Sequence, residues 1–144
     1  MNTSVSENPF GRSIGPTDIV DTLSFFDSWE DRYKYIIDLG KELPAMSDEL
    51  KTEDRLIRGC QSQVWLEHAQ AGEHFQFQAD SDAFIVKGLL GVILSAYNNK
   101  NAADILAFDI EQYFEQLDLM RHLSPTRGNG LRAMVQRIRD IASE

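Results

Sequence analysis

The sequence has 144 residues, a length typical of one domain that buries a core without disulfides or metals. Its net charge of −9, from 23 acidic and 14 basic residues, argues against direct nucleic-acid binding, because a phosphate backbone requires a basic face. The hydrophobic fraction of 42% excludes a disordered chain, and the single cysteine excludes a disulfide scaffold.

Residues 1–15 are predicted to form a flexible arm, because Pro9, Gly11 and Gly15 interrupt regular structure there. Residues 16–144 then form a single domain. Residues 1–8 lack the basic start and apolar run of a signal peptide, and the most apolar stretch, 83–97, contains Lys87 and is too short to span a bilayer. We therefore expect a cytoplasmic protein with no membrane contact.

Two helices are predicted next. Pro16 opens a helix that runs to about residue 26, and Ser28 caps a second helix with Asp31 as its capping-box acid. Gly40 and Pro44 end that helix. Its apolar positions fall on one stripe and are assigned to the core: Trp29, Tyr33, Ile36, Ile37 and Leu43. Residues 45–54 are polar and predict a loop with one helical turn at 48–51.

Three short antiparallel strands are predicted over residues 55–59, 63–69 and 74–79. The second alternates, with Val64, Leu66 and His68 on one face and Gln63, Trp65 and Glu67 on the other. Residues 70–72 form the turn to the third strand, where Phe75, Phe77 and Ala79 face one way.

A helix over 83–97 is predicted to be the centre of the fold, because it is apolar nearly all round and must be covered on most sides. Asp80 or Ser81 begins it, with Asp82 in its first turn. Gly88 and Gly91 leave room for a neighbouring element. Further helices follow over 102–107 and 110–119, and Ser124 caps the last one. The fold class is α+β: a small three-stranded antiparallel sheet packed against a central apolar helix and flanking helices.

Cys60 lies between the apolar pairs Leu56-Ile57 and Val64-Trp65, among residues typical of a turn: Gly59, Gln61 and Ser62. If both flanks are strands, a hairpin carries the thiol at its tip, where another molecule can reach it. A lone intracellular cysteine is also often a small buried hydrophobe. The residues alone leave both interpretations open.

Other candidate groups give weaker signals. His68 and His74 could face each other across the hairpin, but a third metal ligand is missing, because Glu67 and Glu73 alternate to the opposite faces. His122 follows a helix end and is interpreted as solvated or facing the helix dipole. Arg127 lies near two glycines at the start of the last helix, where it either reaches a neighbouring loop or is simply exposed. No phosphate-binding loop or paired-cysteine motif occurs.

Four motifs occur in order along the chain: Gly59-Cys60, QVWL at 63–66, DSDAFIVKGLL at 80–90, and Arg127 before Gly130-Leu131. Together they resemble the SufE family of sulfur acceptors, and the resemblance extends from about Phe10 to the carboxyl terminus. The amino half, with NPFG at 8–11, WEDRY at 29–33 and LGKELP at 39–44, is most similar to the CsdE branch. Residues 59–66 are more similar to SufE itself.

The resemblance implies a sulfur carrier rather than an independent enzyme. Family members accept sulfur from the persulfide of a pyridoxal-phosphate cysteine desulfurase of the SufS or CsdA type and raise its turnover. They pass the sulfur to an iron–sulfur scaffold or, in the CsdE branch, to an E1-like enzyme that modifies transfer RNA. The fold is expected to resemble the IscU scaffolds, but this chain lacks the additional cysteines that hold a cluster. No cofactor of its own is expected, and the chain is expected to be a monomer or weak dimer.

The same resemblance maps the accepting cysteine onto Cys60 and the family arginine near its loop onto Arg127, where it would support the thiolate or the loop. Partner-binding positions are expected at Arg58, Gly59, Gln61, Asp80 and Asp82. We further expect the Cys60 loop to have two placements, tucked when idle and extended into the desulfurase. Two alternatives stay open: a redox sensor with Cys60 as its oxidisable group, and an interaction module with an inert cysteine.

Overall fold

The computed structural model describes residues 8–144 and confirms the predicted α+β class. The helices are α2 (Pro16–Leu23), α3 (Trp29–Gly40), α4 (Phe84–Tyr97), α5 (Ala102–Ala107), α6 (Ile110–Gln116) and α7 (Pro125–Ser143). The strands are β1 (Val64–Ala71), β2 (His74–Ser81) and β3 (Lys100–Asn101). Short 3-10 turns occur at η1 (Asp48–Leu50), η2 (Glu53–Arg55) and η3 (Met120–His122).

The predicted helix starts are confirmed where a capping side chain marks them. Ser28 Oγ accepts a hydrogen bond from Asp31 N at 3.2 Å, and Ser124 Oγ accepts one from Arg127 N at 3.2 Å. Helix α4 differs from the prediction. Its N-cap residue is Ala83. Asp80 and Ser81 instead extend strand β2, and the carboxylate of Asp82 accepts a hydrogen bond from Gln63 N at the end of the Cys60 loop.

The sheet has the order β1-β2-β3, and its third strand is not the predicted one. Strands β1 and β2 pair antiparallel, from Val64 opposite Ser81 to Ala71 opposite His74. The segment 55–59 contributes only η2 and one isolated bridge, between Leu56 and Trp65. It leaves the sheet because Gly59 has a left-handed φ of +92°. Instead Lys100–Asn101, predicted as a loop and helix cap, pairs with β2 at the other edge.

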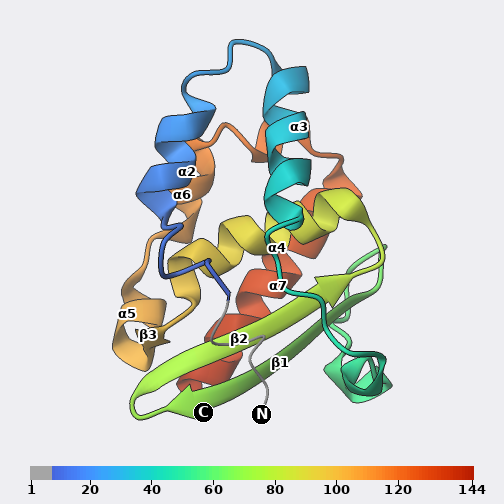
Figure 1. Cartoon of the computed structure of the whole chain (residues 1–144), viewed down its shortest axis with the longest axis vertical. Coiled ribbons are helices and arrows are strands. Elements are labelled where there is room, and N and C mark those ends of the chain that lie inside the picture. The colour runs from blue at the N-terminus through green and yellow to red at the C-terminus, as the bar shows by residue number, and fades with distance from the viewer. Residues whose placement is uncertain (1–7) are drawn as a thin grey trace.

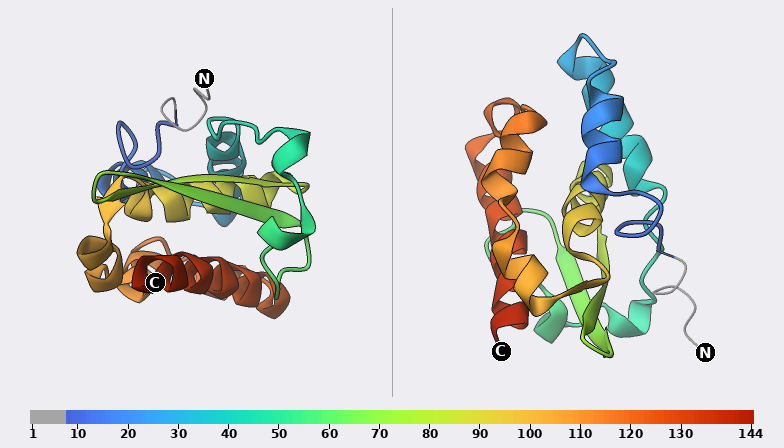
Figure 2. Two further views of the ribbon diagram at one scale, coloured as in Figure 1. Left: turned by 90° about the horizontal axis from the view of Figure 1, so that it is seen from below. Right: turned by 90° about the vertical axis from the view of Figure 1, so that its left-hand side faces the viewer.

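Helix α4 and the sheet form a central layer (Figures 1 and 2). Helix α7 lies along one side of this layer, and α2, α3 and the segment after α3 lie on the other side (Figure 2). This arrangement explains why α4 is buried over most of its circumference, as predicted. Its first residue, Phe84, is the exception, with 75% of its surface exposed.

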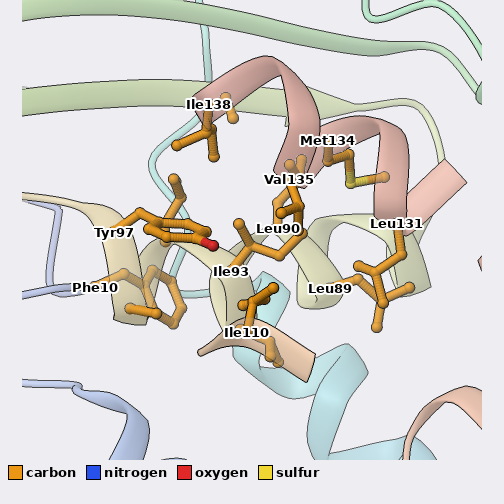
Figure 3. Close-up of a cluster of buried hydrophobic side chains, with 14 of the residues drawn as sticks. Phe10, Leu89, Leu90, Ile93, Tyr97, Ile110, Leu131, Met134, Val135 and Ile138 are labelled. Atoms are coloured by element: carbon orange, nitrogen blue, oxygen red, sulfur yellow. The ribbon is translucent and has the colours of Figure 1, made fainter. Parts of the chain in front are cut away.

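The core joins α4 to α7 and to the amino-terminal segment. Figure 3 shows Leu89, Leu90 and Ile93 of α4 beside Leu131, Met134, Val135 and Ile138 of α7. The two glycines of α4 allow the predicted close approach. A Cβ at Gly91 would lie 2.6 Å from Phe10 Cζ, and a Cβ at Gly88 would collide with the Ile36 carbonyl of α3.

Residues 8–15 pack on the domain, contrary to the prediction of a flexible arm over 1–15, while residues 1–7 lie outside the described residues. Phe10 is fully buried at 0% exposure, and its carbonyl accepts a hydrogen bond from Asn98 Nδ2 at 3.0 Å. Proline and glycine here shape a tight turn, in which Gly11 N donates to Ile14 O at 2.9 Å. Within residues 8–144, no helix combines the length and apolarity needed to cross a membrane.

Candidate functional site

Cys60 lies on a short loop that is anchored at both ends. At its start Ile57 N donates to Val64 O at 2.8 Å, next to the Leu56–Trp65 bridge. The loop is therefore hairpin-like, as the apolar flanks suggested, although a single bridge closes it rather than a strand pair. Figure 2 (left) shows the chain after η2 reaching the beginning of α7.

The thiol is half-buried against the first turns of α7. Cys60 Sγ donates a weak hydrogen bond to Gly130 O at 3.6 Å. Beside it lies a small cavity of about 10 Å³, whose lining includes four apolar side chains of the sheet, α4 and α7: Val64, Val86, Leu89 and Met134. The volume is barely enough for one water molecule, so the cavity suits one additional atom rather than a ligand.

Burial raises the pKa of the Cys60 thiol, and desolvation of the thiolate is the cause. The Gly130 carbonyl accepts a hydrogen bond from the thiol and would face the lone pairs of a thiolate, so this contact also favours the protonated form. In this placement Cys60 is therefore held in its less nucleophilic form.

Arg127 lines the same cavity as Cys60, so the structure brings these two predicted residues together. It does not lower the pKa of the thiol in this placement, since burial dominates. Arg58 and Gln61 lie exposed on either side of Cys60, where a visiting protein can contact them. Gly59 supplies the left-handed turn, with Ala133 Cβ of α7 only 3.4 Å from where its own Cβ would be.

Asp82 and Ser81 hold the exit of the Cys60 loop, a role that the sequence did not indicate. Asp82 Oδ1 accepts a hydrogen bond from Gln63 N at 3.1 Å. Ser81 Oγ donates to Gln63 O at 2.7 Å, and Asp82 N donates to the same carbonyl at 3.3 Å. We call these three contacts the Gln63 clamp. The loop between Ile57 and Gln63 is thus fixed at its ends.

Asp80 has a different setting from the one predicted. It is 2% exposed. Because Asp80 pairs with Trp65, its side chain lies on the face of the sheet that Val64 does not share. Its carboxylate accepts from Met46 N at 3.1 Å and forms ion pairs with Lys51 at 3.4 Å and Lys87 at 3.5 Å. Asp80 therefore ties the segment after α3 to the sheet and is not available to a partner here.

The histidines do not form a pair. His68 is opposite Phe77 and His74 is opposite Ala71, so the two side chains lie on different faces of the hairpin. His122 stacks on Trp29, with ring centroids 4.3 Å apart, and lies 3.3 Å from the Asp118 carboxylate. His122 is exposed, as predicted, and one face of its ring packs on Trp29.

Some neighbours of Cys60 could not be placed beside it from the sequence. Gly130, Thr126 and Met134 lie about seventy positions away and meet the thiol only through the packing of α7 against the Cys60 loop. The spacing of glycines in the last helix was the only hint, since it indicated close contact with another backbone.

A family model described as "SufE: Fe-S metabolism associated domain" matches residues 17–142. An uncharacterised SufE-like protein of Rhizobium etli is 44% identical over 128 residues, covering 86% of each chain. A second, of Rhizobium meliloti, is 41% identical over 128 residues and covers 86% of this chain and 91% of the relative.

The fold also matches a solved structure. A hypothetical protein of Thermus thermophilus, determined in solution, superposes with a TM-score of 0.71. The alignment covers 89% of this chain and 93% of the other at 15% identity. At that identity the similarity establishes the shared fold alone.

Proposed function

This chain belongs to the SufE family, whose role is sulfur transfer tied to iron–sulfur metabolism, and we propose that Cys60 is its sulfur acceptor. In this proposal a cysteine desulfurase donates the sulfur, and the chain passes it to an iron–sulfur scaffold or to an E1-like enzyme that modifies transfer RNA. The observation that carries the proposal is the setting of the only cysteine. Its half-buried thiol lies on a loop that is held by backbone contacts at its ends and by one weak hydrogen bond from the thiol, among exposed residues.

The chemistry requires no metal and no cofactor on this chain. The Cys60 thiolate attacks the outer sulfur of the donor's persulfide, and the bond between the donor's two sulfurs breaks. The donor leaves as a thiolate, and Cys60 becomes a persulfide. No electrons are gained or lost overall, because one sulfur–sulfur bond replaces another.

The two-placement hypothesis follows from the same geometry. When the thiol lies against Gly130, burial and the Gly130 carbonyl both favour the protonated thiol over the thiolate. Transfer then requires the loop to leave the cavity, which removes the desolvation and brings Cys60 to the donor. Arg127 lines the cavity that the thiol leaves, and Arg58 lies on the loop two residues before Cys60; in this proposal both arginines favour the thiolate during transfer.

Replacing Cys60 by Ser tests the acceptor assignment. Cys60→Ser removes the sulfur nucleophile and keeps the side-chain size, so we expect complete loss of sulfur acceptance and a change in unfolding free energy of about 1 kcal/mol or less. The measurement is intact mass after incubation with a cysteine desulfurase and cysteine. Ser62→Ala, which changes the same loop but keeps the thiol, is the control and should gain one sulfur atom.

Three outcomes are distinguishable. One added sulfur on the parent chain and none on Cys60→Ser supports the proposal. Sulfur addition to Cys60→Ser contradicts the assignment. Addition of oxygen after peroxide treatment, without sulfur addition from the desulfurase, would instead identify a redox sensor.

A further inference from the structure

Phe84 is an exposed aromatic residue at the start of an otherwise buried helix. It is 75% exposed, and among residues 8–144 only Phe25 (83%) and Leu106 (37%) are other exposed large hydrophobic residues. Single exposed apolar residues are normal on protein surfaces. Phe84, in addition, borders a cavity.

The cavity beside Phe84 has a volume of about 200 Å³ and lies between α3 and α4. Phe84 and Ile37 supply apolar walls, and Gly40 forms part of the lining. The two helices meet closely at this point, because a Cβ at Gly40 would lie only 2.8 Å from Gly88 N. A cavity of this size is smaller than the roughly 300–1,000 Å³ of pockets for small-molecule ligands. It suits an inserted apolar side chain.

Lysines complete the lining of this apolar cavity, although the whole chain has a net charge of −9. Lys41 Nζ lies 3.1 Å from Asp38, in an exposed pair. Lys87 Nζ lies 3.5 Å from the buried Asp80 and 6.0 Å from the centre of the Phe84 ring. Exposed ion pairs are weak, so the Lys41 ammonium can exchange Asp38 for a carboxylate on another molecule.

Phe84 and Cys60 are within reach of one interface. Phe84 follows Asp82 by two residues, and Asp82 is hydrogen-bonded to Gln63, which follows Cys60 by three residues. At no more than about 3.6 Å per residue, the two Cα atoms are at most roughly 25 Å apart along this path. A standard interface of about 800 Å² per partner is roughly 30 Å across. The start of α4 and the start of α7 also lie at the same end of the molecule (Figure 2).

We propose that Phe84 and the cavity formed with Ile37, Gly40, Lys41 and Lys87 dock the sulfur donor. The occupant is an apolar side chain of the cysteine desulfurase. A carboxylate lies next to this side chain on the desulfurase. The apolar side chain fills the cavity against Phe84, and the carboxylate pairs with Lys41. This inference rests on the proposed function, since it names a second contact with the protein that must reach Cys60.

Phe84→Ala tests the docking role, with Phe25→Ala as a matched control at an exposed position in the loop after α2. The probe is the host's SufS- or CsdA-type cysteine desulfurase, titrated calorimetrically with each full-length variant. We expect Phe84→Ala to raise Kd about tenfold, as truncation of an interface anchor does, and Phe25→Ala to leave it unchanged. Lys41→Glu should raise Kd most at low salt, where charge interactions are least screened. Circular dichroism checks that the variants fold.

The outcomes separate the two proposals. If the parent chain binds the desulfurase and takes sulfur, but Phe84→Ala has the same Kd as Phe25→Ala, the docking proposal alone is wrong. If the parent chain neither binds the desulfurase nor takes sulfur from it, the proposed function is wrong and the docking proposal is lost with it. Weaker binding by Phe84→Ala, with normal loading of Cys60 at saturating desulfurase, supports both.

Discussion

At the scale of single residues, Cys60 is protected by contacts that favour its thiol form over the thiolate. The Gly130 carbonyl accepts a hydrogen bond from the thiol, and burial of the thiol disfavours a charge. Such protection suits the proposed sulfur carrier, because an exposed thiolate would react with any oxidant or electrophile. The same contacts make the reactivity of Cys60 a measure of how often the loop opens.

The alkylation rate of Cys60 should rise with pH along a curve displaced to higher pH than in the unfolded chain. The reason is that alkylation requires the thiolate and burial raises the pKa of the thiol. The stability contributed by the buried thiol is present below its unfolded pKa and is lost as pH rises towards the folded pKa. Iodoacetamide labelling, followed by mass spectrometry with and without denaturant, measures both curves. Coincident curves would contradict the protected placement.

The loop around Cys60 could be predicted from the sequence, and its three-dimensional neighbours could not. A lone cysteine among Gly, Gln and Ser between apolar runs is a local signal, and it indicated the loop correctly. The contact with Gly130 depends on how α7 crosses the sheet, which no local pattern specifies. Asp82 was predicted in the first turn of a helix, but it bonds to Gln63 because β2 extends two residues past its predicted end.

At the scale of elements, the helices were predictable because their caps and apolar stripes are local. Ser28 and Ser124 each accept a hydrogen bond from the backbone three residues later, as their positions indicated. The third strand was not predictable, because Lys100 and Asn101 have little strand propensity. They pair with β2 since the chain leaving α4 passes its edge, where Asn99 N donates to Phe75 O at 2.8 Å.

The Gln63 clamp should control the opening of the Cys60 loop. Asp82→Ala removes the acceptor for Gln63 N and leaves the exit of the loop held only through the Gln63 carbonyl. We therefore expect alkylation of Cys60 at neutral pH to become several-fold faster, since one lost hydrogen bond is worth about 1 kcal/mol. Asp140→Ala, which changes an exposed carboxylate of α7, is the control. Equal rates for both variants would show that the clamp does not limit opening.

At the scale of the whole molecule, the central position of α4 links the amino-terminal segment to the fold. A helix that is apolar nearly all round needs cover on both sides of its layer, and the sequence made this need clear. It did not show that residues 8–15 supply part of the cover, because Pro9 and Gly11 are equally typical of a loose arm. Phe10 fills the space that Gly91 leaves on α4.

Phe10→Ala should therefore destabilise the whole domain without changing the chemistry of Cys60. Removing a fully buried phenylalanine leaves a cavity beside Gly91 and costs about 3–5 kcal/mol of unfolding free energy. Phe25→Ala deletes the same side chain from an exposed site and should cost no more than about 0.5 kcal/mol. Urea denaturation measures both values.

The expectation that Phe10→Ala leaves sulfur acceptance unchanged rests on the separation of Phe10 from Cys60. Phe10 packs against Gly91 of α4 and accepts a hydrogen bond from Asn98. Cys60 instead contacts Gly130 of α7 and lines a cavity with Val64. Because these contacts share no residue, folded Phe10→Ala should take sulfur from the desulfurase as the parent chain does, when both are compared below their unfolding transitions. A variant that stays folded yet loses sulfur acceptance would show that the amino-terminal segment also supports the Cys60 loop. Equal urea midpoints for Phe10→Ala and Phe25→Ala would show instead that residues 8–15 do not contribute to the core.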